Sequence, residues 1–294
     1  RGYARLQLGA FREAEADFDQ VLQQDPQMLD ARIGKGKVLS FQDRFHEALI
    51  LFQRLLKEYP DHPAILYEVA DVMFLMGYFD DARRHCRRCL DKEPGHSGAL
   101  VLLGMMAIRE KQDAAAREFL EEALRNDPEN PYAYNELGYL HHLEGDDGLA
   151  LQDLDTAIRL FPGYADALAN KATVLYYLGE YEEAMGLAER ALELSSGHPV
   201  ALSARGNLLI QEGEYGDAMD CFDQALRRNP DFIDAMMGKV TLLRMMGLED
   251  EAREWQERLR ELEPGLEDEL GPDGPDGDDG DGEEDGKARD VGDE

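Results

Sequence analysis

Apolar residues recur along the chain at the spacing of amphipathic helices, and glycines at a regular interval interrupt the pattern. Residues 248–262 show it plainly: apolar positions stand alternately four and three residues apart, and mostly charged residues fill the gaps. The apolar positions are Leu248, Ala252, Trp255, Leu259 and Leu262. This spacing places apolar side chains on one face of a helix. The pattern therefore predicts an all-α protein in which a glycine turn separates one helix from the next.

The pattern repeats every 34 residues. Alanine keeps this interval throughout, at 14, 48, 82, 116, 150, 184, 218 and 252, and proline keeps it at 26, 60, 94, 128, 162, 230 and 264, with Ser196 as the exception. Glycine follows more loosely inside helices (2, 36, 104, 138, 206) and in turns (9, 77, 145, 179, 213, 247). Small residues allow close helix packing, and proline ends a helix because it lacks an N–H. A single helix pair cannot bury its own apolar face, so the pairs are expected to stack into a solenoid.

The repeat resembles the tetratricopeptide repeat, and residues 165–198, ADALANKATVLYYLGEYEEAMGLAERALELSSGH, carry the family's spacing best. The resemblance covers residues 1–266 and implies a right-handed superhelical solenoid of antiparallel helix pairs. A partial unit occupies 1–28, and full units start at 29, 63, 97, 131, 165, 199 and 233. In the last helix, Gln256 and Arg260 stand where other copies have core residues, so we expect a solvated cap there.

Residues 267–294 form an acidic segment rich in glycine and aspartate. From 265 to 294, 14 acidic residues stand against Lys287 and Arg289. Such a composition cannot bury apolar surface, so a disordered tail is expected. Ordered calcium binding is disfavoured, because the glycine and glutamate of an EF-hand loop do not line up from Asp276 or Asp279.

The net charge of the chain disfavours two classes of partner. The formal net charge of -32, from 31 basic and 63 acidic residues, repels nucleic acids and anionic membranes, so neither is an expected partner. Three cysteines make no disulfide framework, which favours a reducing, cytoplasmic location. Arginine outnumbers lysine 23 to 8, which fits either a high-salt cytoplasm or a GC-rich genome.

Residues 85–96, HCRRCLDKEPGH, have the C-x2-C spacing of half a zinc site. The repeat phase argues against a metal, because Cys86 and Cys89 stand where Phe52 and Leu55 stand one unit earlier. Both are expected to be core residues. The neighbouring arginines are expected to form a ladder of ion pairs with glutamates one unit later: Arg84, Arg87 and Arg88 with Glu118, Glu121 and Glu122.

The chain contains none of the common motifs of nucleophilic, phosphate-binding, zinc-dependent or dinucleotide-binding enzymes. Histidines 62, 96 and 198 share one repeat position just before a new unit, and the adjacent His141 and His142 cannot easily bind one metal. We therefore expect no catalytic residue, no metal and no cofactor.

In the family that the sequence resembles, the second, fifth, ninth, twelfth and often thirteenth positions of each first helix line a concave groove. Carried onto this sequence, with Asn170 added from a sixth position, they give a candidate peptide-binding groove: Tyr67, Phe74, Met105, Arg109, Tyr132, Asn135, Tyr139, His142, Asn170, Thr173, Tyr176, Tyr177, Asn207 and Ile210. Tyrosine offers rigid contact area, and asparagine can bind the backbone of an extended peptide. The alternative is that some tyrosines only pack between first helices. The family's clamp for a terminal carboxylate is disfavoured, because Val200 and Ala204 stand where it needs cations.

The sequence thus favours a non-catalytic scaffold that binds a protein or extended peptide in the groove. The alternative hypothesis is a regulatory or substrate-docking module of a larger enzyme whose catalytic domain lies before Arg1. The oligomeric state stays open.

Overall fold

A computed structural model describes residues 1–7 and 9–263, and all regular structure in this part of the chain is α-helical. The predicted disordered tail, 267–294, lies outside the described residues. The helices are α1 (Gly2–Gln7), α2 (Phe11–Gln24), α3 (Leu29–Phe41), α4 (Phe45–Glu58), α5 (Pro63–Leu75), α6 (Phe79–Lys92), α7 (Ser97–Arg109), α8 (Asp113–Asn126), α9 (Pro131–Leu143), α10 (Asp147–Leu160), α11 (Ala165–Leu178), α12 (Tyr181–Leu194), α13 (Pro199–Glu212), α14 (Tyr215–Arg228), α15 (Ile233–Met245) and α16 (Glu249–Leu262).

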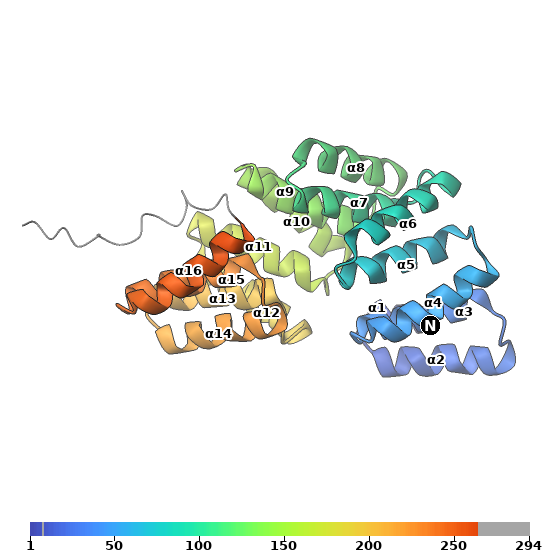
Figure 1. The fold of residues 1–294 in the computed structure, drawn as a ribbon, viewed down its shortest axis with the longest axis horizontal. Helices are drawn as coiled ribbons and strands as arrows, with labels where there is room; N and C mark the ends of the chain where they lie inside the picture. Colours follow the sequence, from blue (N-terminus) through green and yellow to red (C-terminus); the bar gives the residue numbers. More distant parts are fainter. Residues whose placement is uncertain (8, 264–294) are drawn as a thin grey trace, which may run out of the picture.

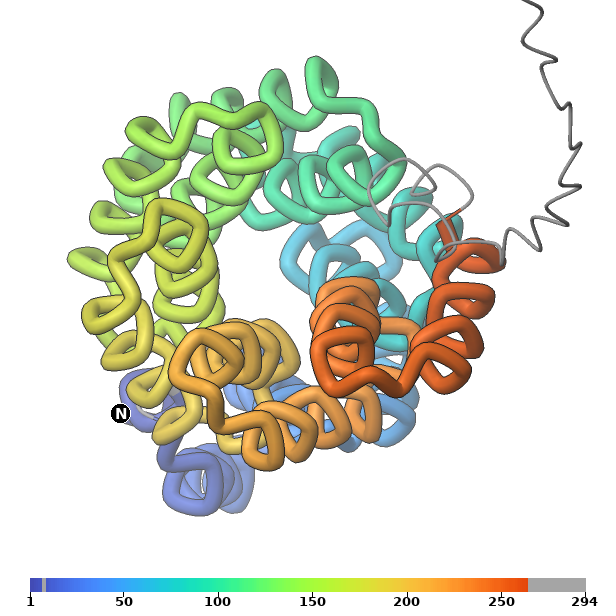
Figure 2. Tube along the Cα trace, turned by 90° about the vertical axis from the view of Figure 1, so that its left-hand side faces the viewer, coloured from blue at the N-terminus to red at the C-terminus, as the bar shows by residue number. Residues whose placement is uncertain are grey.

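The helices form antiparallel pairs that stack into a superhelical solenoid (Figure 1). Each odd-numbered helix packs on its even-numbered partner and on the odd-numbered helices of the neighbouring pairs. Even-numbered helices of neighbouring pairs do not approach one another among the described residues. The odd-numbered helices therefore form a continuous inner layer, and the even-numbered helices form a splayed outer layer (Figure 2). The predicted all-α solenoid is confirmed.

The core consists of small and large residues that meet at fixed positions of the repeat. The alanines of the 34-residue series are all buried, from Ala14 to Ala252, and this confirms their predicted role in close helix packing. Cys86 and Cys89 are fully buried in the core, as predicted. Burial raises the pKa of both thiols to about 12, so they stay protonated and unreactive near neutral pH.

Two of the three histidines that precede first helices cap those helices, whereas the His62 side chain makes no cap hydrogen bond. His96 and His198 are N-cap residues of α7 and α13, and the Nδ1 atom of each accepts a hydrogen bond from a backbone N–H, that of Ala99 at 3.2 Å and that of Ala201 at 3.3 Å. This satisfies a donor that the first helical turn leaves unpaired.

The turn glycines adopt the left-handed conformation that non-glycine residues disfavour. Their φ values lie between 72° and 82°, and no atom beyond the adjacent residues lies within 4 Å of the position that a Cβ would take. The backbone conformation, and not close packing, is therefore the reason for glycine at these positions.

A matched pair of substitutions tests this role. Gly179→Ala places a Cβ at φ 82° and is expected to lower the free energy of unfolding by about 1 kcal/mol. Gly186→Ala, at an exposed position inside α12, is expected to raise it by about 0.5–1 kcal/mol. Urea unfolding measures both, and equal effects of the two substitutions would contradict the assignment.

The predicted arginine–glutamate ladder is wrong. Arg84 pairs with Asp81 of its own helix, and Arg88 Nη2 donates to the Pro60 carbonyl at 3.0 Å. The reason is the splayed outer layer, which keeps α6 and α8 apart. Cross-repeat pairs instead run from an outer helix to the end of a neighbouring inner helix, from Arg83 to Glu110 and from Arg117 to Glu144.

The expected solvated cap also needs correction at Gln256. This side chain is 1% exposed, and its Oε1 accepts a hydrogen bond from Arg244 Nη2 at 2.6 Å. The position is equivalent to the buried Phe222 one unit earlier. A polar side chain thus occupies the core there, because an arginine from α15 hydrogen-bonds to it.

Candidate functional site: the concave groove

The candidate groove lies on the inner layer, where the odd-numbered helices face the middle of the superhelix (Figure 2). Side chains from distant repeats influence one another there. Burial raises the pKa of Tyr139 on α9 to about 12, and the charge of Asp234 on α15 adds to this shift. Tyr132 on α9 likewise lies within the electrostatic influence of Lys37 on α3. Charges on α3 and α15 thus reach tyrosines on α9, several repeats away.

Three of the five predicted tyrosines lie in two aromatic clusters. In the first, Tyr132 packs edge-to-face on Tyr164 with 5.1 Å between ring centroids, and it remains 44% exposed. In the second, Tyr177 lies 5.3 Å from His142 and 5.4 Å from Tyr176, and it is 65% exposed. Tyr132 and Tyr177 therefore keep a large part of their aromatic surface exposed to solvent.

Other residues of the candidate groove pack against neighbouring side chains of the array. Tyr67 lies 5.0 Å from the His96 ring, and burial raises its pKa well above the usual value. Phe74 packs on Phe79, while Met105, Tyr139 and Ile210 contact core clusters. Arg109 lies 4.4 Å above the Phe79 ring, and Thr173 Oγ1 donates to the Ala169 carbonyl. Asn207 is partly buried on α13.

Two of the three asparagines in the candidate groove are hydrogen-bonded to each other. Asn170 Nδ2 donates to Asn135 Oδ1 at 3.0 Å, and Asn135 Nδ2 donates to Glu136 Oε1 at 2.9 Å. Asn135 is only 2% exposed. These amides link α9 to α11 across the inner layer, so they stiffen the groove floor.

The candidate groove residues include no carboxylate, although Asp71 occupies a ninth position of a first helix. Burial, with the charge of Glu68, raises the pKa of Asp71 to about 7, and burial also raises the pKa of Glu136 to about 7. Asp234 has a raised pKa from burial, which His142 partly offsets. Glu68 pairs with Lys37 at 2.7 Å. Glu68 and Glu136 both occupy the sixth position of a unit, two units apart, and this shared position could have identified them.

Exposed apolar side chains recur at the ends of five inner helices, while the polar Arg109 and Gln211 take the same place on α7 and α13. Each of the five apolar residues occupies the thirteenth position of its unit and is between 50% and 65% exposed: Phe41, Leu75, Leu143, Tyr177 and Met245. We call these five residues the apolar line. Only Tyr177 was singled out from the sequence, although the 34-residue period would have identified the others.

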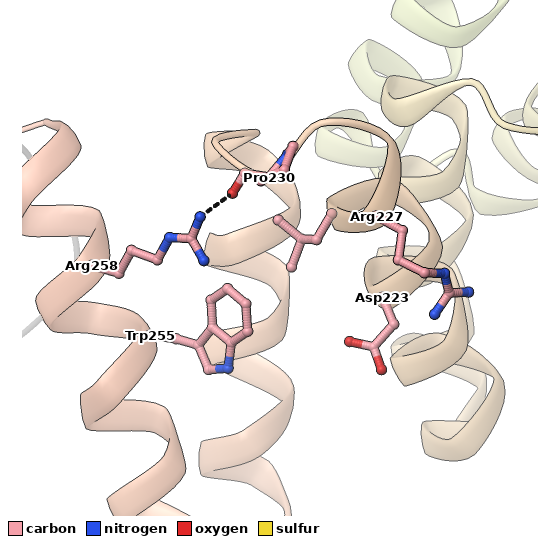
Figure 3. Close-up of a pocket in the computed structure, with 6 residues that line it drawn as sticks. Asp223, Arg227, Pro230, Trp255 and Arg258 are labelled. Carbon is pink, nitrogen blue, oxygen red and sulfur yellow. Dashed lines mark hydrogen bonds between the residues drawn. The ribbon is translucent and has the colours of Figure 1, made fainter.

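A shallow pocket lies between α14 and α16 on the outer layer (Figure 3). Trp255 forms its wall, with Lys239 Nζ 4.4 Å from the ring centroid, and Arg258 Nη2 donates to the Pro230 carbonyl at 2.9 Å. The hydrogen bond from Arg258 to Pro230 joins the last two repeats, so the pocket has a structural explanation.

Two kinds of feature are absent from the described part of the chain. No group of three or more His, Cys, Asp or Glu side chains there could hold a metal ion. None of its helices is long and apolar enough to span a bilayer.

Family models of the tetratricopeptide repeat match residues 5–70, 73–137, 113–165, 148–199 and 199–232. The chain is 31% identical over 110 residues to the Protein CTR9 homolog of Arabidopsis thaliana, a match that covers 37% of this chain and 10% of that protein. It thus spans only a small part of that relative.

Solved structures agree on the fold. A chain of the APC/C heterotetramer Cut9–Hcn1 superposes with a TM-score of 0.65 at 18% identity, over 80% of this chain and 46% of that chain. A tetratricopeptide repeat protein from Parabacteroides merdae gives a TM-score of 0.52 at 19% identity, over 78% and 90%. Together with the family matches and the stacked helix pairs, these similarities place the chain in the tetratricopeptide repeat family.

Proposed function

We propose that the chain is a non-catalytic, cytoplasmic scaffold that binds an extended segment of a partner protein along its concave groove. The apolar line carries this proposal. Its five side chains occupy the same position of the repeat, and each is at least half exposed. Exposed apolar surface of this kind is typical of a protein interaction site. The Cut9–Hcn1 neighbour is itself an assembly of different proteins, which fits the same use of the fold.

The chemistry of the inner face supports a segment with apolar and basic side chains. Asp71, Glu136 and Asp234 are carboxylates that burial makes costly to ionise. A lysine or arginine from a partner would stabilise their charged forms. Nucleic acids and anionic membranes are disfavoured as partners by the net charge of -32.

Alanine substitution of Tyr139, Tyr176 and Tyr177 together is expected to weaken partner binding at least tenfold, which corresponds to about 1.4 kcal/mol. The readout is titration of an array of extended peptides, varied in basic and apolar content, with the full chain. Tyr78→Ala removes an exposed tyrosine outside the predicted groove and should leave binding unchanged.

Because Tyr139 is partly buried, a second variant keeps the test independent of folding. Leu75→Ser with Leu143→Ser changes only half-exposed residues of the apolar line. Far-UV circular dichroism verifies the helix content of each variant. If both variants retain their helices and bind the same peptides as the unaltered chain, the groove assignment is wrong.

A further inference from the structure

Two turns of the repeat depart from glycine. The turn position recurs every 34 residues, and it is Gly at 9, 77, 145, 179, 213 and 247 but Asp43 and Lys111 in the other two turns. Asp43 has a φ of 59° and Lys111 a φ of 56°, in the region that side chains with a Cβ disfavour. Both turns make the same backbone hydrogen bonds as a glycine turn: Arg44 N to Leu39 O matches Glu180 N to Leu175 O, each 2.9 Å. Local structure therefore gives no reason to avoid glycine at these two positions.

The side chains of these two residues reach the far end of the chain. Asp43 Oδ2 lies 2.5 Å from Arg228 Nη2, at the end of α14 and 185 residues away. Lys111 Nζ lies 2.8 Å from Glu263 Oε2, just after α16 and 152 residues away. Pairs such as Arg83–Glu110, by contrast, join neighbouring repeats.

These contacts occur where the superhelix has wound round on itself. Figure 2 shows the C-terminal helices, in orange and red, in front of the N-terminal helices in blue and teal. Among the described helices, backbones approach one another only within a repeat or between neighbouring repeats. The two turns of the superhelix therefore meet through side chains at their edges, and Asp43 and Lys111 supply two of these contacts.

We propose that Asp43 and Lys111 form an ionic clasp with Arg228 and Glu263 that holds the two turns of the superhelix together and closes the concave groove from the side. The closure regulates access to the groove, and this functional reading rests on the proposed function. All four side chains are at least one-third exposed, so each pair is weak and screened by salt. A clasp of this kind opens and recloses readily.

The experiment measures closure directly, in the full chain without a partner. Spin labels are attached at His46→Cys on α4 and Gln224→Cys on α14, both exposed positions, while the three native cysteines are buried. Pulsed dipolar spectroscopy gives the distance distribution at 0.05 M and 1 M NaCl. We expect a single narrow distribution at low salt that lengthens and broadens at high salt.

Asp43→Gly with Lys111→Gly should give the long, broad distribution at both salt concentrations, without lowering the melting temperature, because glycine suits these φ values. Exchange of the charges, Asp43→Arg with Arg228→Asp, should preserve the narrow distribution. The control places the same side chains in two other turns, Gly145→Asp with Gly179→Lys, and should leave the low-salt distances unchanged. An unchanged distribution in the glycine variant, or an equal change in the control, would overturn the clasp. Neither result depends on whether the groove binds a segment.

Discussion

Replacement of Phe222 by alanine is expected to lower the free energy of unfolding by about 3–5 kcal/mol, the range for a fully buried aromatic residue. The Phe222 ring sits between two inner helices. A Cβ at Gly206 on α13 would lie 2.7 Å from its Cε1 atom, and one at Gly238 on α15 would lie 2.4 Å from it. The glycines leave room for this ring alone, so alanine would leave a cavity between two repeats that the backbones cannot readily close.

The same geometry predicts which helices lose stability first. A solenoid is held together by contacts between neighbouring repeats, so loss of Phe222 should loosen α13 to α16 first. Amide hydrogen exchange should rise in those helices while α3 to α6 keep their protection. Phe222→Leu is the control, with an expected cost of about 1–2 kcal/mol, because leucine fills the equivalent place at Leu120 and Leu154. Equal losses in both variants, or a uniform rise of exchange, would contradict this account.

The pairing of large rings with glycine shows how far sequence reasoning extends. The 34-residue period predicted the helix pairs and the first glycine of each contact, such as Gly206, from spacing alone. The second glycine, Gly238, belongs to the next repeat, as Gly34 does beside Phe18. The same position is Glu68 after Phe52 and is not glycine in the other repeats, so a search for a residue type that recurs every 34 residues does not find these glycines.

The candidate groove was predictable in position but less so in chemistry. Repeat phase placed Tyr132 and Tyr177 on the inner face, and both are exposed there. It could not show that Asn135 and Asn170 bind each other, because that contact depends on the distance between two inner helices. The contact between Asp43 and Arg228 was even harder to predict from the sequence, because it depends on small rotations between repeats that accumulate along the solenoid.

Stability is expected to fall as the pH rises from about 4 to 7, in part because of Asp71 and Glu136. Burial raises the pKa of each carboxyl to about 7 in the folded state, above the ordinary values of 3.8 and 4.5 that apply to the unfolded chain. The folded state therefore binds protons more tightly across this range. The resulting stability is fully present below the unfolded pKa and is lost as the pH passes through the folded pKa.

Asp71→Asn removes this penalty at Asp71. Relative to the unaltered chain, we expect its gain in the free energy of unfolding to grow by about 2–3 kcal/mol between pH 5 and pH 8, since one pKa unit corresponds to about 1.4 kcal/mol. Glu136→Gln should behave similarly, although its hydrogen bond from Asn135 Nδ2 limits the gain. Asp91→Asn, at an exposed position on α6, should change stability by less than about 0.5 kcal/mol at either pH.

Urea unfolding at the two pH values measures these differences. If Asp71→Asn stabilised the protein equally at pH 5 and pH 8, the carboxyl would have an ordinary pKa and the inner face would be well hydrated. That result would also remove the electrostatic reason for a basic partner segment. If the gain grows with pH as expected, ionisation of these carboxylates destabilises the folded chain. A lysine or arginine of a partner that pairs with them would then recover part of this lost free energy on binding.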